Sequence, residues 1–433
     1  MIYWLFNNTP LLFFIQSFWR DEAFSFLLAK KRVVEIIFLT AKDFNPPLYY
    51  LILHFWIKIF GPGEIAVRAL SLIFFIASFY IFFLFLQKIL LVKKGWIFLY
   101  SILFLINPLL IYYAFEGRMY SLLLFFASLS FYCLLRKNSF GYFWSILLGL
   151  FTHYFMILVV GGQFLYIVLS TKKNYKIFRE KIIKAGLIFF TWVIFLILNK
   201  NNIGKTFWIK KPKITDFFSL PFTLYTGYDF DFNFYQNSFH WLFAFWLILI
   251  CVSIIYWVLK GGQNKLFFLI FVWAILIPWL VFLLSFLKPI FLSRYLIFST
   301  FGLLILLVYI LEKTPPKIRL FILVVLIFLT YHYNLVQIKY RRKADIRKVI
   351  REIKKLANEN DFLFVTNELD FHTAEYYFGE KNVFIYGKTF EEIPDYVGKI
   401  LIPKNKIVYS LPIYPQKAFV LKDDLTYSIQ ALY

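Results

Sequence analysis

The chain has 433 residues, of which 61% are hydrophobic and only 16% are charged. A water-soluble domain of ordinary composition carries about 25% charged residues, so this composition argues against a soluble globular protein. Lys and Arg outnumber Asp and Glu by 47 to 24, which gives a formal net charge of +23. The sequence therefore predicts an integral membrane protein with a basic excess.

Apolar runs near twenty residues recur up to residue 338, and a run of that length spans a bilayer core of about 30 Å. The predicted spans are 64–87, 96–115, 118–135, 183–199, 239–259, 265–286, 295–312 and 317–335. The stretch 141–170 is expected to go out and come back, and residues 1–18 are interrupted by Asn7, Asn8 and Pro10, so an opening span there is expected to be short or truncated. We expect an all-α polytopic bundle of roughly ten or eleven transmembrane helices.

Basic residues in the short loops decide the predicted orientation, because such loops stay on the cytoplasmic side. The loops placed inside contain, among others, Lys93, Arg136, Lys173, Lys260 and Lys317. The outer side then receives 19–63, 200–238 and everything after 336. Both signs of charge gather on that side, which favours a polar site suited to phosphate. We expect a multi-pass protein of the plasma (inner) membrane whose active site and C-terminal domain are extracytoplasmic.

The character of the chain changes near residue 339, so we predict two domains, 1–338 and 339–433. Residues 343–358 have the pattern of an amphipathic helix. Its apolar face would comprise Ile346, Val349, Ile350, Ile353 and Leu356. Short apolar runs follow at 361–366, 383–386 and 407–411. This alternation predicts a small α/β domain, interpreted as accessory because it has no glycine-rich phosphate loop and no cluster of metal ligands.

The first predicted outer loop, 19–63, carries two motifs. Asp21 and Glu22 follow Trp19 at the mouth of the bundle, where charges are costly unless they are used. The alternative is an exposed helix start, where acidic residues are favoured. The string from Asp43 to Tyr50 contains paired prolines, which predict a new helix over 48–60 lying in the membrane interface.

Three further motifs lie at the outer ends of predicted spans. Glu116 and Arg118 precede Tyr120, His153 lies between Thr152 and Tyr154, and Arg294 precedes Tyr295. Each has an ordinary explanation. The first pair can be a mutual ion pair, the histidine can bridge helices, and Arg294 can snorkel to the interface.

Taken together, the order and spacing of these motifs resemble the GT-C superfamily of membrane glycosyltransferases. The closest branch contains dolichyl-phosphate-mannose–protein mannosyltransferase-like and aminoarabinose-transferase-like enzymes, and the resemblance covers residues 15 to about 312. Asn45 departs from the pattern, since many relatives carry a histidine before the prolines, and the first span is shorter.

The resemblance implies an inverting, polyprenyl-phosphate-sugar-dependent glycosyltransferase acting on a glycan, lipid or protein acceptor. Asp21 would be the general base, and Glu22 would orient it or contact the sugar. The implied substrate-binding residues are Asp43, Glu116, Arg118, Tyr120, His153, Arg294 and Tyr295. No cofactor is certain, a divalent cation stays open, metal ligands are unknown, and no nucleic-acid partner is expected.

The chemistry of the residues leads independently to a lipid-borne donor. Nucleotide sugars are cytoplasmic, so a transferase with an outward site needs a donor carried by lipid. Phosphate leaves without a general acid, so one base suffices for a single inverting displacement, and Arg118 and Arg294 can neutralise the departing charge. The alternatives are a lipid-carrier flippase or transporter, which predicts midplane charges and repeats, and a polysaccharide polymerase or ligase.

Overall fold

The computed structural model describes residues 2–43, 45–170, 175–199, 208–228, 239–259 and 264–433. It divides into two compact units. The helical unit comprises Met1–Leu11, Arg68–Phe195 and Ile209–Tyr340, and the mixed unit comprises Leu12–Val67, Leu196–Trp208 and Arg341–Tyr433. The C-terminal region thus forms one compact unit with residues 12–67, while the domain boundary predicted at 338/339 stays a prediction.

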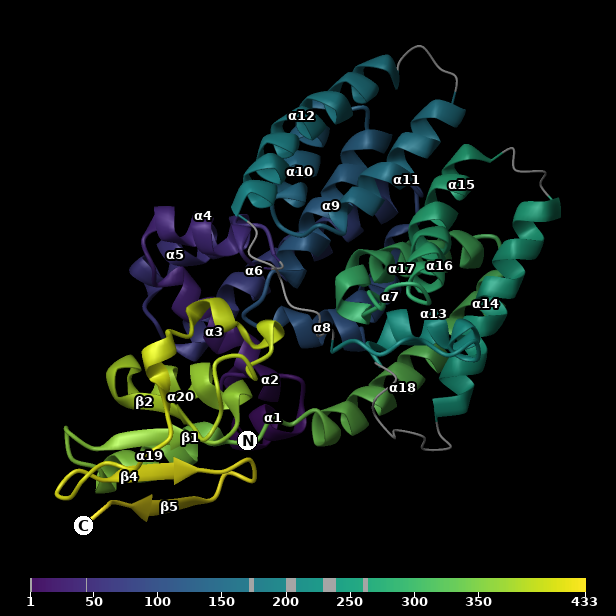
Figure 1. Ribbon diagram of the computed structural model, residues 1–433. Helices are drawn as coiled ribbons and strands as arrows, with labels where there is room; N and C mark the ends of the chain where they lie inside the picture. Colours follow the sequence, from purple (N-terminus) through teal and green to yellow (C-terminus); the bar gives the residue numbers. More distant parts are fainter. Residues whose placement is uncertain (1, 44, 171–174, 200–207, 229–238, 260–263) are drawn as a thin grey trace. The chain divides into compact units, whose positions relative to one another are not determined.

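The helical unit consists of apolar helices that range from 7 residues in α1 to 25 residues in α6 (Figure 1). Its helices are α1 (Ile2–Asn8), α6 (Glu64–Lys88, whose first turn belongs to the mixed unit), α7 (Lys94–Leu105), α8 (Pro108–Ala114), α9 (Tyr120–Leu135), α10 (Ser139–Leu150), α11 (Met156–Leu169), α12 (Lys176–Asn199), α13 (Asp216–Thr226), α14 (His240–Leu259), α15 (Lys265–Phe271), α16 (Ile277–Leu284), α17 (Ile297–Leu311) and α18 (Pro316–Tyr340). A π-helical turn, Val272–Leu276, joins α15 to α16.

Length and composition identify the candidate membrane spans. Among the described residues, six helices are long and apolar enough to cross a bilayer, or up to seven when the bent pair α7 and α8 counts as one. Shorter apolar helices occupy Leu48–Phe60, Tyr120–Leu135, Ser139–Leu150 and Met156–Leu169. The protein is therefore a multi-pass membrane protein, and the predicted ten or eleven transmembrane helices are reached only if shorter helices also cross.

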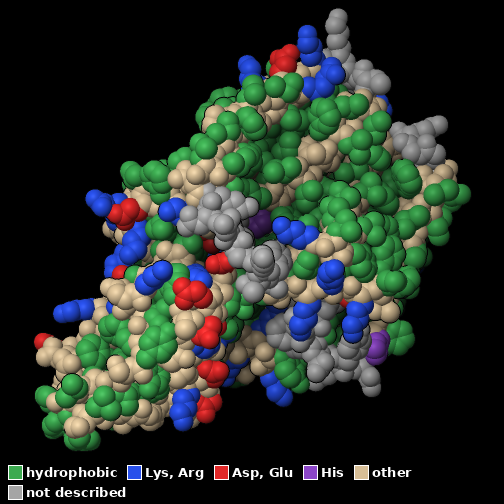
Figure 2. Space-filling view, viewed as in Figure 1, with side chains coloured by type: hydrophobic (Ala, Val, Ile, Leu, Met, Phe, Trp, Pro, Cys, Tyr) green, Lys and Arg blue, Asp and Glu red, His purple; other side chains and the backbone are tan. Residues whose placement is uncertain are grey.

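Surface chemistry agrees with a lipid environment for the helical unit. Hydrophobic side chains cover most of its surface on the face shown in Figure 2, and charged side chains gather where helices end. On α12, the exposed residues include Ile183, Leu187, Phe190, Ile197 and Leu198. By contrast, every residue of α17 is buried, so this helix forms the centre of the unit.

One predicted span is broken. The sequence analysis treated 96–115 as a single helix, but α7 ends at Leu105, α8 begins at Pro108, and the two are bent by 63°. Proline has no N–H to continue the ladder and its ring clashes with the preceding turn. Asn107 accepts a hydrogen bond from the Leu110 N–H (2.9 Å) and so caps the new helix.

Two other expectations concern connecting segments. The stretch 141–170 forms α10 and α11 with His153 in the turn between them, as predicted. The predicted outer loop 200–238 contains the buried helix α13 in its described part. Tyr225 of α13 is fully buried and shares a hydrogen bond of 2.7 Å with Thr330, so it does not lie in an exposed loop.

The mixed unit combines short helices with a small sheet (Figure 1). Its helices are α2 (Leu12–Ile15), α3 (Arg20–Ala29), α4 (Val33–Ala41), α5 (Leu48–Phe60), α19 (Ile346–Leu356) and α20 (Phe371–Phe378). Its strands are β1 (Phe362–Val365), β2 (Val383–Tyr386), β3 (Ile407–Val408), β4 (Ala418–Leu421) and β5 (Tyr427–Gln430), in the order β3-β2-β1-β4-β5. All neighbouring strands are parallel except β4 and β5.

The predicted α/β domain is confirmed, with two differences. Ile346, Ile350 and Ile353 are buried against the sheet, whereas Leu356, the last residue of α19, is 57% exposed. The strands β4 and β5 were not predicted, and β5 alternates polar and apolar residues instead of forming an apolar run. The helix expected at 48–60 is α5, which ends at Gly61 in a positive-φ conformation (87°) that glycine adopts readily.

Candidate active site

Five of the predicted site residues converge in the helical unit. We call them the arginine–aromatic cluster: Arg118, Tyr120, His153, Arg294 and Tyr295. The guanidinium carbons of Arg118 and Arg294 each lie 5.9 Å from the centroid of the Tyr120 ring, and that of Arg294 lies 5.7 Å from the Tyr295 ring. The His153 ring is 5.0 Å from Tyr295 and 6.3 Å from Tyr120. Two cations thus flank one phenol ring.

Local backbone structure explains how the cluster is placed. The break at Pro108 leads through α8 to a tight turn in which the Arg118 N–H donates to the Glu116 carbonyl (2.7 Å). Ser71 of α6 donates to the Arg118 carbonyl (3.2 Å), and α9 then begins at Tyr120. Arg294 and Tyr295 belong to the 3-10 turn Ser293–Leu296 that precedes α17. Three separate segments therefore supply the cluster: the turn that leads into α9, the turn between α10 and α11, and the turn that precedes α17.

The cluster is cationic, and its members are buried except for Arg294 and Tyr295, which are half-buried. Arg118 and His153 are 8% and 5% exposed. Burial first, and then the positive charges of Arg118 and Arg294, lower the pKa of His153 well below its usual range, so the imidazole is neutral at neutral pH. Its Nδ1 accepts the Phe155 N–H (3.1 Å), which places the imidazole hydrogen on Nε2. Such a group of donors suits an anion.

Glu116 is buried in the same turn as Arg118, with 4% of its surface exposed. A carboxylate two residues from a guanidinium limits the net positive charge of the site. Its carboxylate oxygens can also accept hydrogen bonds from sugar hydroxyls, whereas arginine has no acceptor atom.

The Asp-Glu motif lies at the start of α3 in the mixed unit. Glu22 is fully buried, and its Oε2 accepts both the Trp19 N–H (2.9 Å) and the Lys343 ammonium (2.9 Å). Asp21 is only partly buried. The adjacent acids Asp21 and Glu22 therefore occupy different environments.

A third acidic residue of the predicted site, Asp43, follows α4. It is 7% exposed and accepts a hydrogen bond of 3.4 Å from the Asn45 amide.

The partners of this motif were not predicted. Lys343 pairs with Glu22, and Asp370 accepts two hydrogen bonds from Arg20 (2.8 and 3.3 Å). Neither belongs to a recognisable local pattern, since each lies more than 300 residues from its partner along the chain. Within the described part of the chain, no three His, Cys, Asp or Glu side chains form a group that could hold a metal ion.

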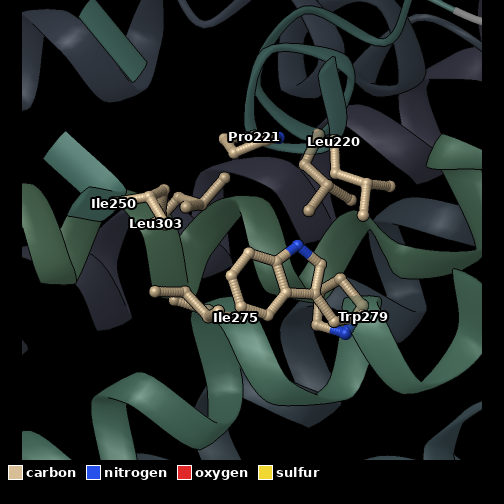
Figure 3. A pocket seen from close by; sticks show the side chains of 9 residues that line it. Leu220, Pro221, Ile250, Ile275, Trp279 and Leu303 are labelled. Atoms are coloured by element: carbon tan, nitrogen blue, oxygen red, sulfur yellow. The ribbon is translucent and has the colours of Figure 1, made fainter. Parts of the chain in front are cut away.

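A small apolar pocket lies elsewhere in the helical unit, beside the π-helical turn (Figure 3). Its walls include Leu220, Pro221, Ile250, Ile275, Trp279 and Leu303. None of its lining residues is ionisable, so it carries no acid, base or phosphate-binding group. This pocket therefore adds no residue to the arginine–aromatic cluster or the Asp-Glu motif.

The architecture defines the class of fold: a polytopic helical bundle with a small α/β region is the GT-C type expected from the motifs. Solved structures confirm this. The chain is similar to ArnT from Cupriavidus metallidurans in the apo state, with a TM-score of 0.66 and 11% identity over 95% of this chain and 90% of ArnT. It is also similar to the same protein bound to undecaprenyl phosphate, with a TM-score of 0.60 and 12% identity over 95% and 91%. No family model and no curated protein matches the sequence. At these identities the likeness establishes the fold.

Proposed function

We propose that the protein is an inverting glycosyltransferase that moves a sugar from a polyprenyl-phosphate carrier to an acceptor on the outer face of the plasma membrane. The observation that carries this proposal is the arginine–aromatic cluster within a GT-C fold. One of the similar solved structures holds undecaprenyl phosphate, which supports a carrier of that chemical class.

The cluster has the properties that a departing phosphate requires. Cleavage of the sugar–phosphate bond leaves a second negative charge on the carrier phosphate. Arg118 and Arg294 offer planar guanidinium groups whose paired N–H groups match phosphate oxygens, and the burial of Arg118 strengthens such contacts. The Nε2 hydrogen of His153 and the Tyr120 hydroxyl add neutral donors at the same place.

Asp21 is the proposed general base. The acceptor oxygen bonds to the anomeric carbon as the bond from that carbon to the phosphate oxygen breaks, and the bonding electrons go to the carrier phosphate. The acceptor proton passes to the Asp21 carboxylate. One base is sufficient because phosphate leaves without protonation, and a single displacement inverts the anomeric centre. Glu116 and Asp43 are proposed to bind hydroxyl groups of the sugar or acceptor.

The decisive experiment is an assay of the purified protein with a panel of polyprenyl-phosphate sugars and acceptors of the glycan, lipid and protein classes. Transfer with inversion from at least one lipid-linked donor is expected, and a free nucleotide sugar should not serve. Efficient use of a nucleotide sugar would reject the mechanism. Translocation of the carrier across vesicles without any sugar transfer would instead identify a flippase.

A further inference from the structure

We propose that Glu22 is a positioning residue rather than a substrate-binding one, and that its buried ion pair with Lys343 holds α3 and so fixes the direction of the Asp21 side chain. This inference rests on the proposed function, because it explains how the side chain of the general base is oriented. It also gives the C-terminal region a part in positioning that base, beyond an accessory role.

The ion pair itself is enclosed. The Lys343 Nζ lies 2.9 Å from the Glu22 Oε2, and the two side chains are only 5% and 0% exposed. The same carboxylate oxygen accepts the Trp19 N–H, as the N3 acid of a capping box does. Glu22 thus satisfies one of the free N–H groups at the start of α3 and neutralises a buried ammonium. These two contacts direct its carboxylate into the protein.

Backbone bonds tie the segment before α3 to the same stretch of the C-terminal region. The Lys343 N–H donates to the Gln16 Oε1 (3.0 Å), and the Ser17 hydroxyl donates to the Ala344 carbonyl (2.9 Å). Because these bonds involve the backbone of Lys343 and of the residue that follows it, they hold the backbone from which the Lys343 side chain reaches Glu22.

A second set of contacts comes through Tyr377 of α20. Its hydroxyl accepts the Phe18 N–H (2.7 Å) and donates to the Glu64 carboxylate. Burial first, and then the hydrogen bond to Glu64 and the charge of Glu64, raise the pKa of Tyr377, so the hydroxyl keeps its proton. Arg347 pairs with the other Glu64 oxygen (2.5 Å) and donates to the Ile15 carbonyl (3.2 Å). The entry to α3 is therefore held from α19 and α20 together.

The remaining face of α3 is held through Arg20. Its guanidinium binds Asp370, directly before α20, with two hydrogen bonds of 2.8 and 3.3 Å. One turn further on, Phe24 packs against His372, with ring centroids 5.7 Å apart. Contacts of Arg20, Glu22 and Phe24 therefore restrain rotation of α3 about its axis.

That constraint matters for Asp21. Consecutive residues of an α-helix point about 100° apart, so fixing Glu22 inward determines where its neighbour Asp21 points. Asp21 keeps part of its surface exposed, unlike Glu22. A displacement of about 1 Å at a reacting group can cost on the order of 10²-fold in rate, so small rotations of α3 would reduce turnover.

A double-mutant cycle with Glu22→Gln, Lys343→Met and the combined variant tests the proposal, with kcat, KM and thermal unfolding measured for each. Each single change should lower the unfolding temperature and reduce kcat by about 10- to 100-fold, because each leaves a partner buried without its charge. The combined variant should unfold at a higher temperature than either single variant and regain part of kcat. Lys343→Arg should retain more activity than Lys343→Met.

If Glu22 instead contacts the substrate or takes part in the reaction, the double-mutant cycle gives a different result. Glu22→Gln would then lose activity that adding Lys343→Met does not restore, even where the combined variant regains thermal stability. That outcome would overturn the proposal. Lys30→Gln is the matched control, because it removes an exposed ion pair of the same unit, with Glu380 (2.6 Å), and should change neither property appreciably.

The two proposals fail separately. If the wild-type protein transfers no sugar from any lipid-linked donor, the proposed function is wrong, and the unfolding temperatures still show whether Glu22 and Lys343 are coupled. If the wild-type protein is active but the cycle shows no coupling in kcat or unfolding temperature, the positioning role is wrong and the transferase assignment stands.

Discussion

At the scale of single residues, Asp21 and Glu22 show how adjacent carboxylates acquire different roles. The two side chains share a helix turn, yet Glu22 is enclosed with Lys343 and Asp21 retains exposed surface. A general base must reach its substrate, so the partly exposed acid is the better candidate. The buried acid is suited to holding the helix.

The first prediction follows from this difference. Asp21→Asn should abolish transfer, with a loss of about 10²- to 10⁴-fold in kcat, because the amide cannot take the acceptor proton. Expression and the unfolding temperature should stay close to wild type, since Asp21 is only partly buried and asparagine has the same size and shape. Turnover near the wild-type rate would remove Asp21 from the mechanism.

The second prediction concerns Arg294. Arg294→Lys should reduce activity, and Arg294→Ala should reduce it further, by on the order of 10²-fold or more, because lysine offers a point charge where guanidinium offers a paired fork. Binding of a polyprenyl-phosphate sugar should weaken in the same order. Arg136→Ala, an exposed arginine after α9, is the control and should behave like wild type. Unchanged affinity and turnover in Arg294→Ala would show that the arginine merely snorkels.

At the scale of elements, the broken helix α7–α8 directs the chain toward Arg118. The break frees backbone carbonyls, and the neighbouring helix α18 binds them. The Asn334 amide donates to the Ile106 carbonyl (2.7 Å), and the Gln337 amide donates to the Pro108 carbonyl (3.3 Å). In an apolar environment, backbone groups without partners are costly, so these amides stabilise the bend.

The third prediction tests this bend. Asn334→Leu removes the amide donor and leaves the Ile106 carbonyl buried, which should destabilise the protein by about 1–3 kcal/mol. Activity should fall as well, because α8 leads directly into the turn that carries Glu116 and Arg118. Thermal unfolding in detergent measures the first effect and the transfer assay the second. Tyr331→Phe, at an exposed position of the same helix, should leave both unchanged. Equal stability of Asn334→Leu and wild type would mean that the bend holds without this bond.

At the scale of the whole molecule, the proposed use of a lipid-borne donor depends on one orientation in the membrane, with the active site on the outer side. The loops expected on the cytoplasmic side include Lys173 and Lys260, both of which lie outside the described residues. Tyr225 and Tyr377 belong to regions predicted to lie outside. Tyr225 is buried and Tyr377 is partly buried, so a cysteine at either position would be a poor target for a thiol reagent. Cysteines at exposed positions report better on which side of the membrane a segment lies.

The fourth prediction uses such residues. Single cysteines placed by Lys94→Cys and Lys422→Cys, in a background lacking Cys133 and Cys251, should differ in their labelling by an impermeant thiol reagent added to intact cells. We expect labelling at position 422 and none at 94, because basic short loops remain inside. Both side chains are exposed in the structure, so burial does not prevent reaction at either. Labelling at 94 from outside would invert the topology and place the chemistry in the wrong compartment.

The sequence by itself determined the features that depend on neighbouring residues. The length of the apolar runs predicted the long helices. The helical periodicity of Ile346, Ile350 and Ile353 predicted the buried face of α19. The motifs around Asp21, Arg118 and Arg294 were recognisable because their spacing is short. Such signals are local, because hydrophobic periodicity, proline and glycine each determine the backbone structure of only a few neighbouring residues.

Only the tertiary structure decided which distant residues meet. The cluster of Arg118, His153 and Arg294 draws on segments far apart in the chain. The Glu22–Lys343 pair joins residues 321 positions apart, and neither residue reveals the other in sequence. Packing decides such pairs, because the free energy of a buried charge depends on the partner that the folded chain brings to it. For the same reason, the role of the C-terminal region could not be read from its own residues, since it depends on the helix that it holds.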